Sequence, residues 1–226
     1  MQLEGNHSVS TIASSVDSGL SIIKNAAEQN ADLLLVHHGM FWGLPLAITD
    51  SHKEIVKTLI DSNLSLVAQH LPLDASEKYG NNYSLARLLE LENLSPAAFY
   101  KGKAIGCIGE NSKNNPFAFF VNTLKQKLEG IGSFSSLDFG PKVPEKICIV
   151  SGSAADQLHQ YKEEGFDTFI TGEPKQFAYH FCKDNGINAI FAGHYATETL
   201  GVKNIAEATA KKFNLKHVFI NHPTGI

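Results

Sequence analysis

The chain has 226 residues, of which 43% are hydrophobic and 19% are charged, a composition typical of a globular protein rather than a disordered or fibrous one. The net charge of −4 argues against direct binding of nucleic acid, and no apolar run is long enough to span a membrane. Three widely spaced cysteines, Cys107, Cys148 and Cys182, form no pairing motif, and residues 1–5 do not resemble a signal or transit peptide. We therefore expect buried thiols, a cytoplasmic location and either one large domain or two small ones.

The first 75 residues alternate predicted strands and helices. Strands are expected over 9–16, 31–36 and 64–68, and helices over 18–29 and 51–62, the second opening on the capping box Ser51-His52-Lys53-Glu54. The second strand is an apolar run that ends in His37-His38-Gly39, and a loop rich in aromatic residues, glycine and proline follows over 40–45. Pro72 disfavours a regular helix after the third strand, so His70 and Asp74 are expected in a loop.

The rest of the chain continues this alternation. Strands are expected over 103–108, 146–150, 167–171, 187–192 and 216–220, and helices over 82–92, 116–128, 153–164 and after Pro174. Residues 93–102 are interpreted as a connection and residues 129–144 as a loop or a poorly paired edge. A last helix begins at His194 or near Thr197 and ends at about Phe213. Strands and helices at this spacing predict an α/β fold with largely parallel pairing.

An internal repeat divides the sequence into two similar halves. Residues 11–38 align with 146–173 at an offset of 135, and residues 63–74 align with 187–198 at an offset of 124. The second block places His70 on His194 and Asp74 on Glu198. Chance similarity between strand–helix–strand units is the alternative, but the polar residues fall in register at the same strand ends. We expect one half to comprise residues 1–98 and 187–226, carrying most metal ligands, and the other residues 99–186, with approximate boundaries and strands that can be exchanged.

Five polar residues lie just past predicted strands, where a parallel sheet brings side chains to one edge. They are His37, His38, Asp74, His194 and Glu198. Each has an ordinary alternative taken singly, such as packing or helix capping, but together they favour a metal site. Three imidazoles and two carboxylates exceed the needs of one ion and suit two ions about 3.5–4 Å apart. Mixed nitrogen and oxygen donors suit Zn, Mn, Fe, Co or Ni better than Ca or Mg.

Other residues are weaker candidates. His70 is interpreted as a further ligand or as a residue that supports one. Glu173 is an acid/base or orienting residue unless it only stabilises a helix N-terminus, and His180 is a helix-face residue or, less favoured, a proton shuttle. The turn Ser151-Gly152-Ser153 is weak evidence for a phosphate cradle. Three aromatic residues either stack on a planar substrate or pack in the core: Phe41, Trp42 and Tyr195.

Several ordered motifs resemble the Nif-three-like family of dinuclear-metal proteins, known in bacteria as GTP cyclohydrolase I type 2 homologues. The motifs cover nearly the whole chain and are Gln2–Gly5, Val36–Trp42, His70–Ala75, Gly80–Asn82, Ile170–Glu173 and Ala192–Glu198. The family's two-metal ligands fall on His37, His38, Asp74, His194 and Glu198. The resemblance also implies a three-layer α/β fold with a mostly parallel mixed sheet, built by duplication. It further implies a toroidal homohexamer whose metal sites face an internal cavity.

Two departures from the family pattern are visible. Family members usually carry a helical segment before the Gln-Leu-Glu-Gly stretch with which this sequence opens, and residues 99–145 are too few for the domain inserted in larger members. The first departure bears on the packing of the first strand and on the hexamer.

Two functional hypotheses follow. The first is a dinuclear metal-dependent hydrolase, in which metal-activated water attacks a small-molecule substrate such as a nucleotide, another heterocycle or a phosphoester. The second is a non-catalytic protein that binds or delivers metal, or a regulatory interaction partner.

Overall fold

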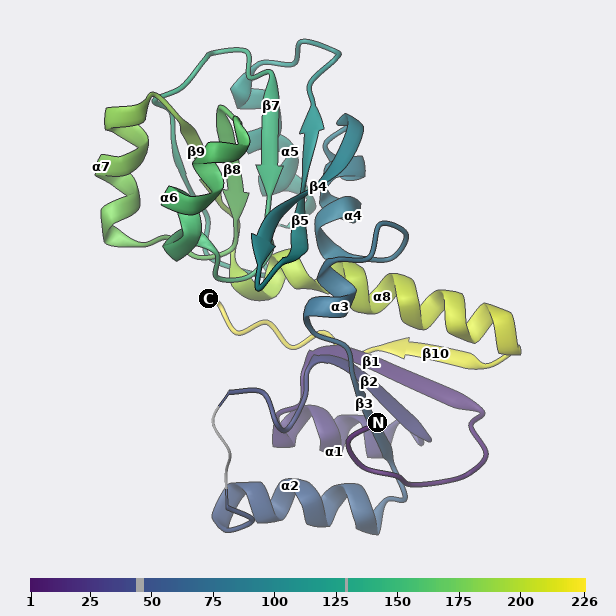
Figure 1. Ribbon diagram of the computed structural model, residues 1–226. Helices are drawn as coiled ribbons and strands as arrows, with labels where there is room; N and C mark the ends of the chain where they lie inside the picture. The colour runs from purple at the N-terminus through teal and green to yellow at the C-terminus, as the bar shows by residue number, and fades with distance from the viewer. Residues whose placement is uncertain (44–46, 129) are drawn as a thin grey trace. The chain divides into compact units, whose positions relative to one another are not determined.

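The computed structural model describes residues 1–43, 47–128 and 130–226, which divide into two units (Figure 1). The first unit comprises residues 1–73 and 201–222, and the second comprises residues 74–200 and 223–226. The chain leaves the first unit within helix α3 (Leu71–Asp74) and returns to it within helix α8 (His194–Phe213). The boundaries expected from the sequence, after residues 98 and 186, both fall inside the second unit.

The first unit is a parallel sheet between two layers of helix. Its strands lie in the order β10 (Lys216–Phe219), β1 (Thr11–Asp17), β2 (Leu33–His38) and β3 (Ser65–Ala68). Helices α1 (Leu20–Glu28) and α2 (Asp50–Asp61) cover one face of this sheet (Figure 1). Residues of α8 from Gly201 onward cover the other face.

Strand β2 shows why this sheet is buried on both faces. Leu34 and Val36 belong to the apolar cluster under α1 and α2, whereas Leu33 and Leu35 pack in the cluster that contains Ala206 of α8. Successive side chains of a strand point to opposite faces, so a strand covered on both sides needs a continuous apolar run. The run before His37 is therefore an inner strand, as the sequence predicts.

The second unit is a mixed sheet that also has helices on both faces. Its strands lie in the order β4 (Glu92–Tyr100), β5 (Lys103–Glu110), β7 (Lys146–Ile149), β8 (Thr168–Thr171), β9 (Asn188–Phe191) and β6 (Ser135–Leu137). Strands β7, β8 and β9 are parallel, and the other pairs are antiparallel. Helices α4 (Asn81–Leu88) and α5 (Phe117–Lys127) supply one core, and α6 (Leu158–Tyr161) and α7 (Gln176–Asn185) supply the other.

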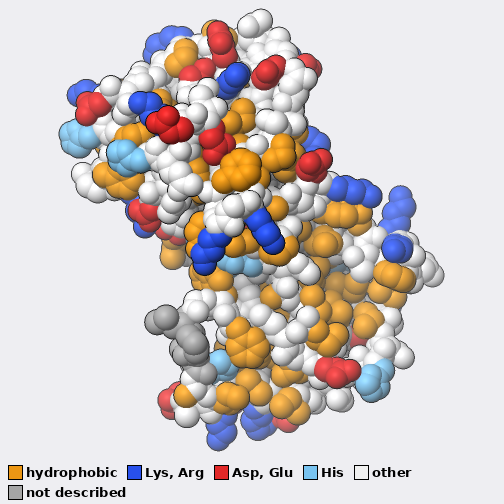
Figure 2. All heavy atoms as spheres, in the orientation of Figure 1, with side chains coloured by type: hydrophobic (Ala, Val, Ile, Leu, Met, Phe, Trp, Pro, Cys, Tyr) orange, Lys and Arg blue, Asp and Glu red, His pale blue; other side chains and the backbone are white. Residues whose placement is uncertain are grey.

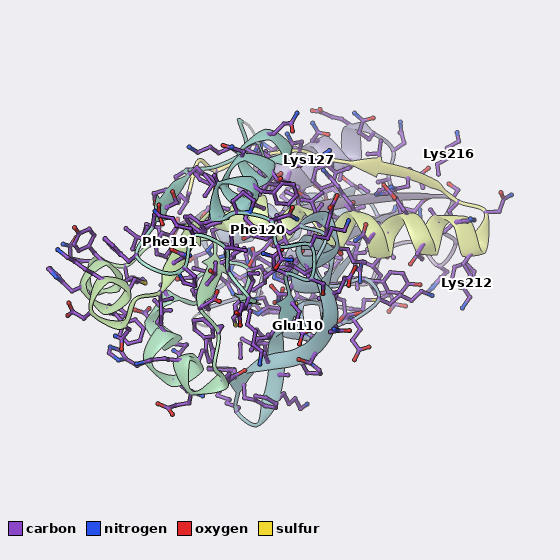
Figure 3. The ribbon with its side chains drawn as sticks, turned by 90° about the horizontal axis from the view of Figure 1, so that it is seen from above. Glu110, Phe120, Lys127, Phe191, Lys212 and Lys216 are labelled. Atoms are coloured by element: carbon purple, nitrogen blue, oxygen red, sulfur yellow. The ribbon has the colours of Figure 1, made fainter. Side chains whose placement is uncertain are left out.

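Figure 3 labels side chains of both kinds, some in the interior and some on the surface. Phe120 of α5 and Phe191 of β9 are 0% and 3% exposed and lie among the sticks of the second unit's interior. Lys212 and Lys216 are exposed, at the end of α8 and the start of β10. The cores therefore form around both sheets, and the fold is an α/β fold of three-layer units.

The two units repeat one strand–helix–strand arrangement in the same register. Ile12 pairs with Leu33 in the first unit, and Ile147 pairs with Thr168 in the second, which confirms the offset of 135. For the second aligned block, the predicted offset differs by one residue from the offset set by strand pairing. Leu33 pairs with Ser65 and Thr168 pairs with Asn188, so the offset is 123 rather than 124.

The corrected offset changes one residue equivalence. His70 occupies the place of Gly193, and the predicted equivalences of His70 with His194 and of Asp74 with Glu198 are wrong. His70 and His194 match when the sequences are aligned without a gap, but the pairing of the strands sets the true equivalence.

Three other local predictions are corrected. Residues 92–100 form strand β4 rather than a connection; Pro96 is tolerated because β4 is an edge strand. Helix α2 has Thr49 as its N-cap, so Ser51 lies in the first turn and does not open a capping box. Residues 71–74 form a single helical turn, because a proline fits the first turn, where its missing N–H has no partner to lose. The alternative of α8 beginning at His194 is the one observed.

Three further expectations concern the thiols and the surface. Cys107, Cys148 and Cys182 are buried free thiols, and burial raises the pKa of each. Among the described residues, no helix combines the length and apolarity that a membrane crossing requires. On the face shown in Figure 2, the acidic and basic side chains of the described residues are intermixed rather than gathered into one patch.

Candidate metal centre

His37 and His38 are the last two residues of strand β2, in the first unit. Their side chains are almost fully enclosed, with exposures of 0% and 4%. The strand pairs with β1 as far as His38 and with β3 as far as Val36, so neighbouring strands position the backbone that leads into these two residues. Their ring centroids lie 4.8 Å apart.

Hydrogen bonds orient both rings in the same way. Nδ1 of His37 lies 2.9 Å from the carbonyl oxygen of Gln69, and Nδ1 of His38 lies 2.8 Å from Oδ1 of Asp17. Both oxygens are acceptors, so each Nδ1 donates its proton and each Nε2 carries the lone pair. A carbonyl or carboxylate on the remote nitrogen is the arrangement that orients histidine ligands in metal sites. Asp17 carried no signal in the sequence because its role depends on strand pairing.

His70 joins this pair within the first unit. Its ring centroid lies 4.9 Å from that of His37 and 5.3 Å from that of His38, and one nitrogen of each ring lies within 4.8 Å of the others. Trp42 stacks on His38, with ring centroids 4.0 Å apart and planes inclined by 18°. Phe41 is 62% exposed. The loop predicted over 40–45 is described only to residue 43, and Leu44 and Pro45 lie outside the described residues.

In the second unit, His194 opens helix α8 and Glu198 follows one turn later. Nε2 of His194 lies 3.2 Å from Oε2 of Glu198, and Nδ1 of His194 is hydrogen-bonded to Oε1 of Glu173. Burial alone would lower the pKa of His194, but the carboxylates of Glu198 and Glu173 raise that pKa to about 9. Imidazole and carboxylate are thus held side by side, with Glu173 oriented towards the remote nitrogen as Asp17 is towards His38.

Asp74 is held by residues of the second unit. Its side chain is 6% exposed, and its Oδ1 accepts hydrogen bonds from Nδ2 of Asn81 at 2.9 Å and from Oγ of Ser151 at 3.0 Å. Asn82 ties the same segments together, because its Oδ1 accepts from the backbone N–H of Ser151 and its Nδ2 donates to the carbonyl of Ile105. These bonds fix the orientation of the Asp74 carboxylate before any ligand binds.

Gly152 separates Ser151 from the His194–Glu198 pair, and its size is critical. A Cβ atom built on Gly152 would lie 2.4 Å from Oε1 of Glu198 and 3.2 Å from Nε2 of His194. Its φ of 69° is also a conformation that side chains disfavour. The turn considered as a phosphate cradle is therefore occupied by carboxylate contacts. Sequence reasoning missed this role, because the glycine matters only through the approach of residues distant in the chain.

The remaining candidates lie apart from these contacts. His180 is exposed on α7 with its ring 5.2 Å from that of Tyr179, as expected for a residue on a helix face. Tyr195 is 1% exposed, which favours core packing over the stacking role that the sequence also allowed. Each unit therefore carries side chains that could hold a metal ion and are oriented by hydrogen bonds: histidine nitrogens in the first unit, and an imidazole with a carboxylate in the second.

Comparison with known proteins gives consistent matches over the chain. The family model Duf34/NIF3 (NGG1p interacting factor 3) matches residues 1–225. The chain is 40% identical over 226 residues to a Deinococcus radiodurans protein named GTP cyclohydrolase 1 type 2 homolog, and the match covers 100% of this chain and 85% of that protein. A Pyrococcus abyssi protein of the same name is 38% identical, with 100% of this chain and 90% of that protein covered.

Solved structures agree with these matches. The crystal structure of TTHA1606 from Thermus thermophilus is similar with a TM-score of 0.89 and 37% identity, covering 100% of this chain and 88% of that chain. The structure of protein ybgI, described as of unknown function, is similar with a TM-score of 0.90 and 28% identity, covering 100% of this chain and 90% of that one. The residues of both donor sets lie within all of these matches.

Proposed function

This chain belongs to the Duf34/NIF3 family, and from that premise we propose that it is a dinuclear metal-dependent hydrolase. Its substrate is a small molecule with a nucleotide, heterocycle or phosphoester centre, as the name GTP cyclohydrolase 1 type 2 homolog of its relatives suggests. The ligands in this proposal are His37, His38, Asp74, His194 and Glu198, with His70 as an additional ligand or a supporting residue.

One observation carries the proposal: three histidines, the buried His37 and His38 and the half-buried His194, each direct Nδ1 at an oxygen acceptor. The acceptors are the Gln69 carbonyl for His37, Asp17 for His38 and Glu173 for His194. A histidine that only packs can form its hydrogen bond through either ring nitrogen. A histidine that binds metal must present one defined nitrogen to the ion. The repetition of one orientation at three histidines supports ligation over packing.

The protein's own groups prepare the site. Asn81 and Ser151 orient the Asp74 carboxylate, and Glu173 positions His194, so we assign Glu173 to orientation rather than to proton transfer. Divalent transition-metal ions such as Zn, Mn, Fe, Co or Ni, when bound, supply a hydroxide nucleophile near neutral pH and polarise the bond under attack. The enclosed side chains limit access of bulk water, which strengthens electrostatic interactions with a substrate.

The family resemblance supports two further parts of the proposal. We propose that the protein assembles as a toroidal homohexamer and that it functions in the cytoplasm. Light scattering on the purified protein tests the assembly, for which a hexamer mass is expected.

Turnover is the experiment that tests the proposed activity. Metal-loaded protein is assayed against nucleotides, pterins and phosphoesters, beside the Asp74→Ala, Glu198→Ala double variant and a His180→Ala control on the exposed face of α7. We expect hydrolysis of at least one class by the wild type and the control, with a loss of about 100-fold or more in the double variant. If the wild type and the double variant are equally inert on every substrate, the hydrolase proposal is wrong and the metal-binding or metal-delivery role takes its place.

A further inference from the structure

A pocket of about 250 Å³ lies in the first unit, beside the end of strand β2. Its lining includes His38 and Gly39, together with residues at the starts of helices α1 and α2. Met40, Trp42 and Ile55 give it apolar walls. The volume is below the range of about 300–1,000 Å³ that encloses a whole drug-sized ligand. The pocket therefore suits one group of a larger molecule.

His52 is the most unusual residue of this pocket. Its side chain is 7% exposed, and neither ring nitrogen has a hydrogen-bond partner among the described residues. Burying an imidazole without partners is costly, and buried polar atoms in folded proteins are nearly always satisfied. Because His52 lines the pocket, a polar group bound there would offer its ring a partner.

Two helix N-termini meet at the same pocket. Gly19 is the N-cap of α1 and Thr49 is the N-cap of α2, and neither helix has a side-chain capping hydrogen bond. The first N–H groups of a helix have no acceptor within the helix, and the helix dipole makes this end positive. A Cβ atom built on Gly19 meets nothing within 4 Å, so the space in front of α1 is open.

The neighbouring side chains add donors. Ser18 and Ser51 line the pocket, and a serine hydroxyl can donate a hydrogen bond to an oxyanion. Asp17 also lines it, but its Oδ1 accepts the hydrogen bond from Nδ1 of His38. These groups are two helix N-termini, two hydroxyls and one imidazole, which favour an anion. Two carboxylates oppose it: Asp17, whose Oδ1 is engaged by His38, and Asp50 in the first turn of α2.

We propose that this pocket binds the phosphate group of a phosphorylated substrate. The phosphate accepts hydrogen bonds from His52, from the serine hydroxyls and from the first turns of α1 and α2, which places the attached moiety beside His38. The use of the pocket as a substrate subsite rests on the proposed hydrolase function, whereas phosphate binding itself does not.

Calorimetric titration with inorganic phosphate tests the proposal, on the metal-loaded protein and after removal of metal with a chelator. We expect saturable binding at one site per chain in both states. His52→Phe keeps an aromatic ring but removes both nitrogens, and it should weaken binding about tenfold or more. His159→Phe, on the exposed surface of α6, is the matched control and should bind phosphate as the wild type does.

A second variant keeps the test informative if His52→Phe does not fold. Gly19→Asp places a carboxylate at an N-cap position that favours aspartate and has open space, so the fold should be kept or stabilised. Its negative charge occupies the position of the anion, and phosphate binding should again fall about tenfold or more.

Two results would overturn the phosphate site: no saturable binding to the metal-free wild type, or wild-type affinity in folded His52→Phe or Gly19→Asp. Metal content measured on the same samples separates this proposal from the proposed function. If the purified protein holds no metal but binds phosphate through His52, the hydrolase proposal is contradicted and the phosphate site is supported.

Discussion

The two units carry the same strand–helix–strand scaffold but different chemistry at equivalent places. In the first unit, Asp17 at the end of β1 pairs in register with His38 at the end of β2. At the equivalent places of the second unit stand Gly152 and Glu173, and the N–H of Glu173 donates to the Gly152 carbonyl. A carboxylate and an imidazole in one copy thus correspond to a glycine and a carboxylate in the other.

The difference shows how one scaffold can support a histidine in two ways. In the first copy, the carboxylate comes from the first strand and holds the histidine that ends the second strand. In the second copy, the carboxylate of Glu173 follows the second strand and holds His194, which follows the third strand. The second copy therefore needs no carboxylate after its first strand. Gly152 stands at that place and leaves room for Glu198.

Among these variants, Gly152→Ala should cause the largest loss of metal affinity, and it acts in the second copy. The added methyl group would lie 2.4 Å from Oε1 of Glu198, and the φ of 69° disfavours any side chain. We expect a loss of metal affinity of about 100-fold, because the carboxylate must move. Competition with a chromophoric chelator measures the affinity.

Gly165→Ala is the matched control. It also has a positive φ, 78°, but a Cβ atom there meets nothing within 4 Å. It should cost about 1 kcal/mol of stability from backbone strain and leave metal affinity unchanged. Equal metal affinities for the two alanine variants would contradict the steric role assigned to Gly152.

Asp17→Ala and Glu173→Ala should have comparable, intermediate effects. Each removes the carboxylate that accepts the hydrogen bond from Nδ1 of a proposed ligand, His38 or His194. Loss of such a supporting partner lowers metal affinity by about 10–100-fold. Titration of each purified variant with metal gives the comparison directly.

Amide variants sharpen this test. Asp17→Asn and Glu173→Gln keep an oxygen acceptor for Nδ1 and should recover part of the affinity that the alanine variants lose. If the alanine variants bind metal as tightly as the wild type, the orientation account of the two copies is contradicted.

The scaffold was easier to predict from the sequence than the hydrogen bonds that support the proposed ligands. His37 and His38 follow an apolar run whose two-sided burial is a property of the run itself, and His194 follows another. Asn81 and Ser151 were not predicted as supports because Ser151 meets Asp74 across 77 positions of sequence. Likewise β4 was missed because Pro96 argues against a strand unless its place at the sheet edge is known.

Asp32 and Asp167 are a further equivalent pair and should have the smallest effect. Oδ2 of Asp32 accepts hydrogen bonds from the N–H of Ser10 at 2.8 Å and of Thr11 at 3.0 Å; Oδ2 of Asp167 accepts from the N–H of Glu145. Removal of either carboxylate should cost about 1 kcal/mol, because these bonds lie near the solvent. Urea unfolding at pH 7, after removal of metal with a chelator, measures the loss in free energy of unfolding for both variants.

The pH dependence of Asp32→Ala has a defined sign. The Ser10 N–H is the main cause that lowers the pKa of Asp32 below its ordinary 3.8 in the folded state. The stabilisation is therefore complete above about pH 3.8 and is lost as the pH falls through the lower folded value. The stability difference between wild type and variant should shrink in that acidic range; a difference independent of pH would contradict this assignment.

Metal content tests the central claim, that both copies supply ligands to bound ions. The wild type, the His37→Ala, His38→Ala variant and the Asp74→Ala, Glu198→Ala variant are purified without affinity tags or chelators and analysed by elemental mass spectrometry. The account predicts about two divalent ions per chain in the wild type and at most about one in each variant. Full wild-type metal content in either variant would contradict it.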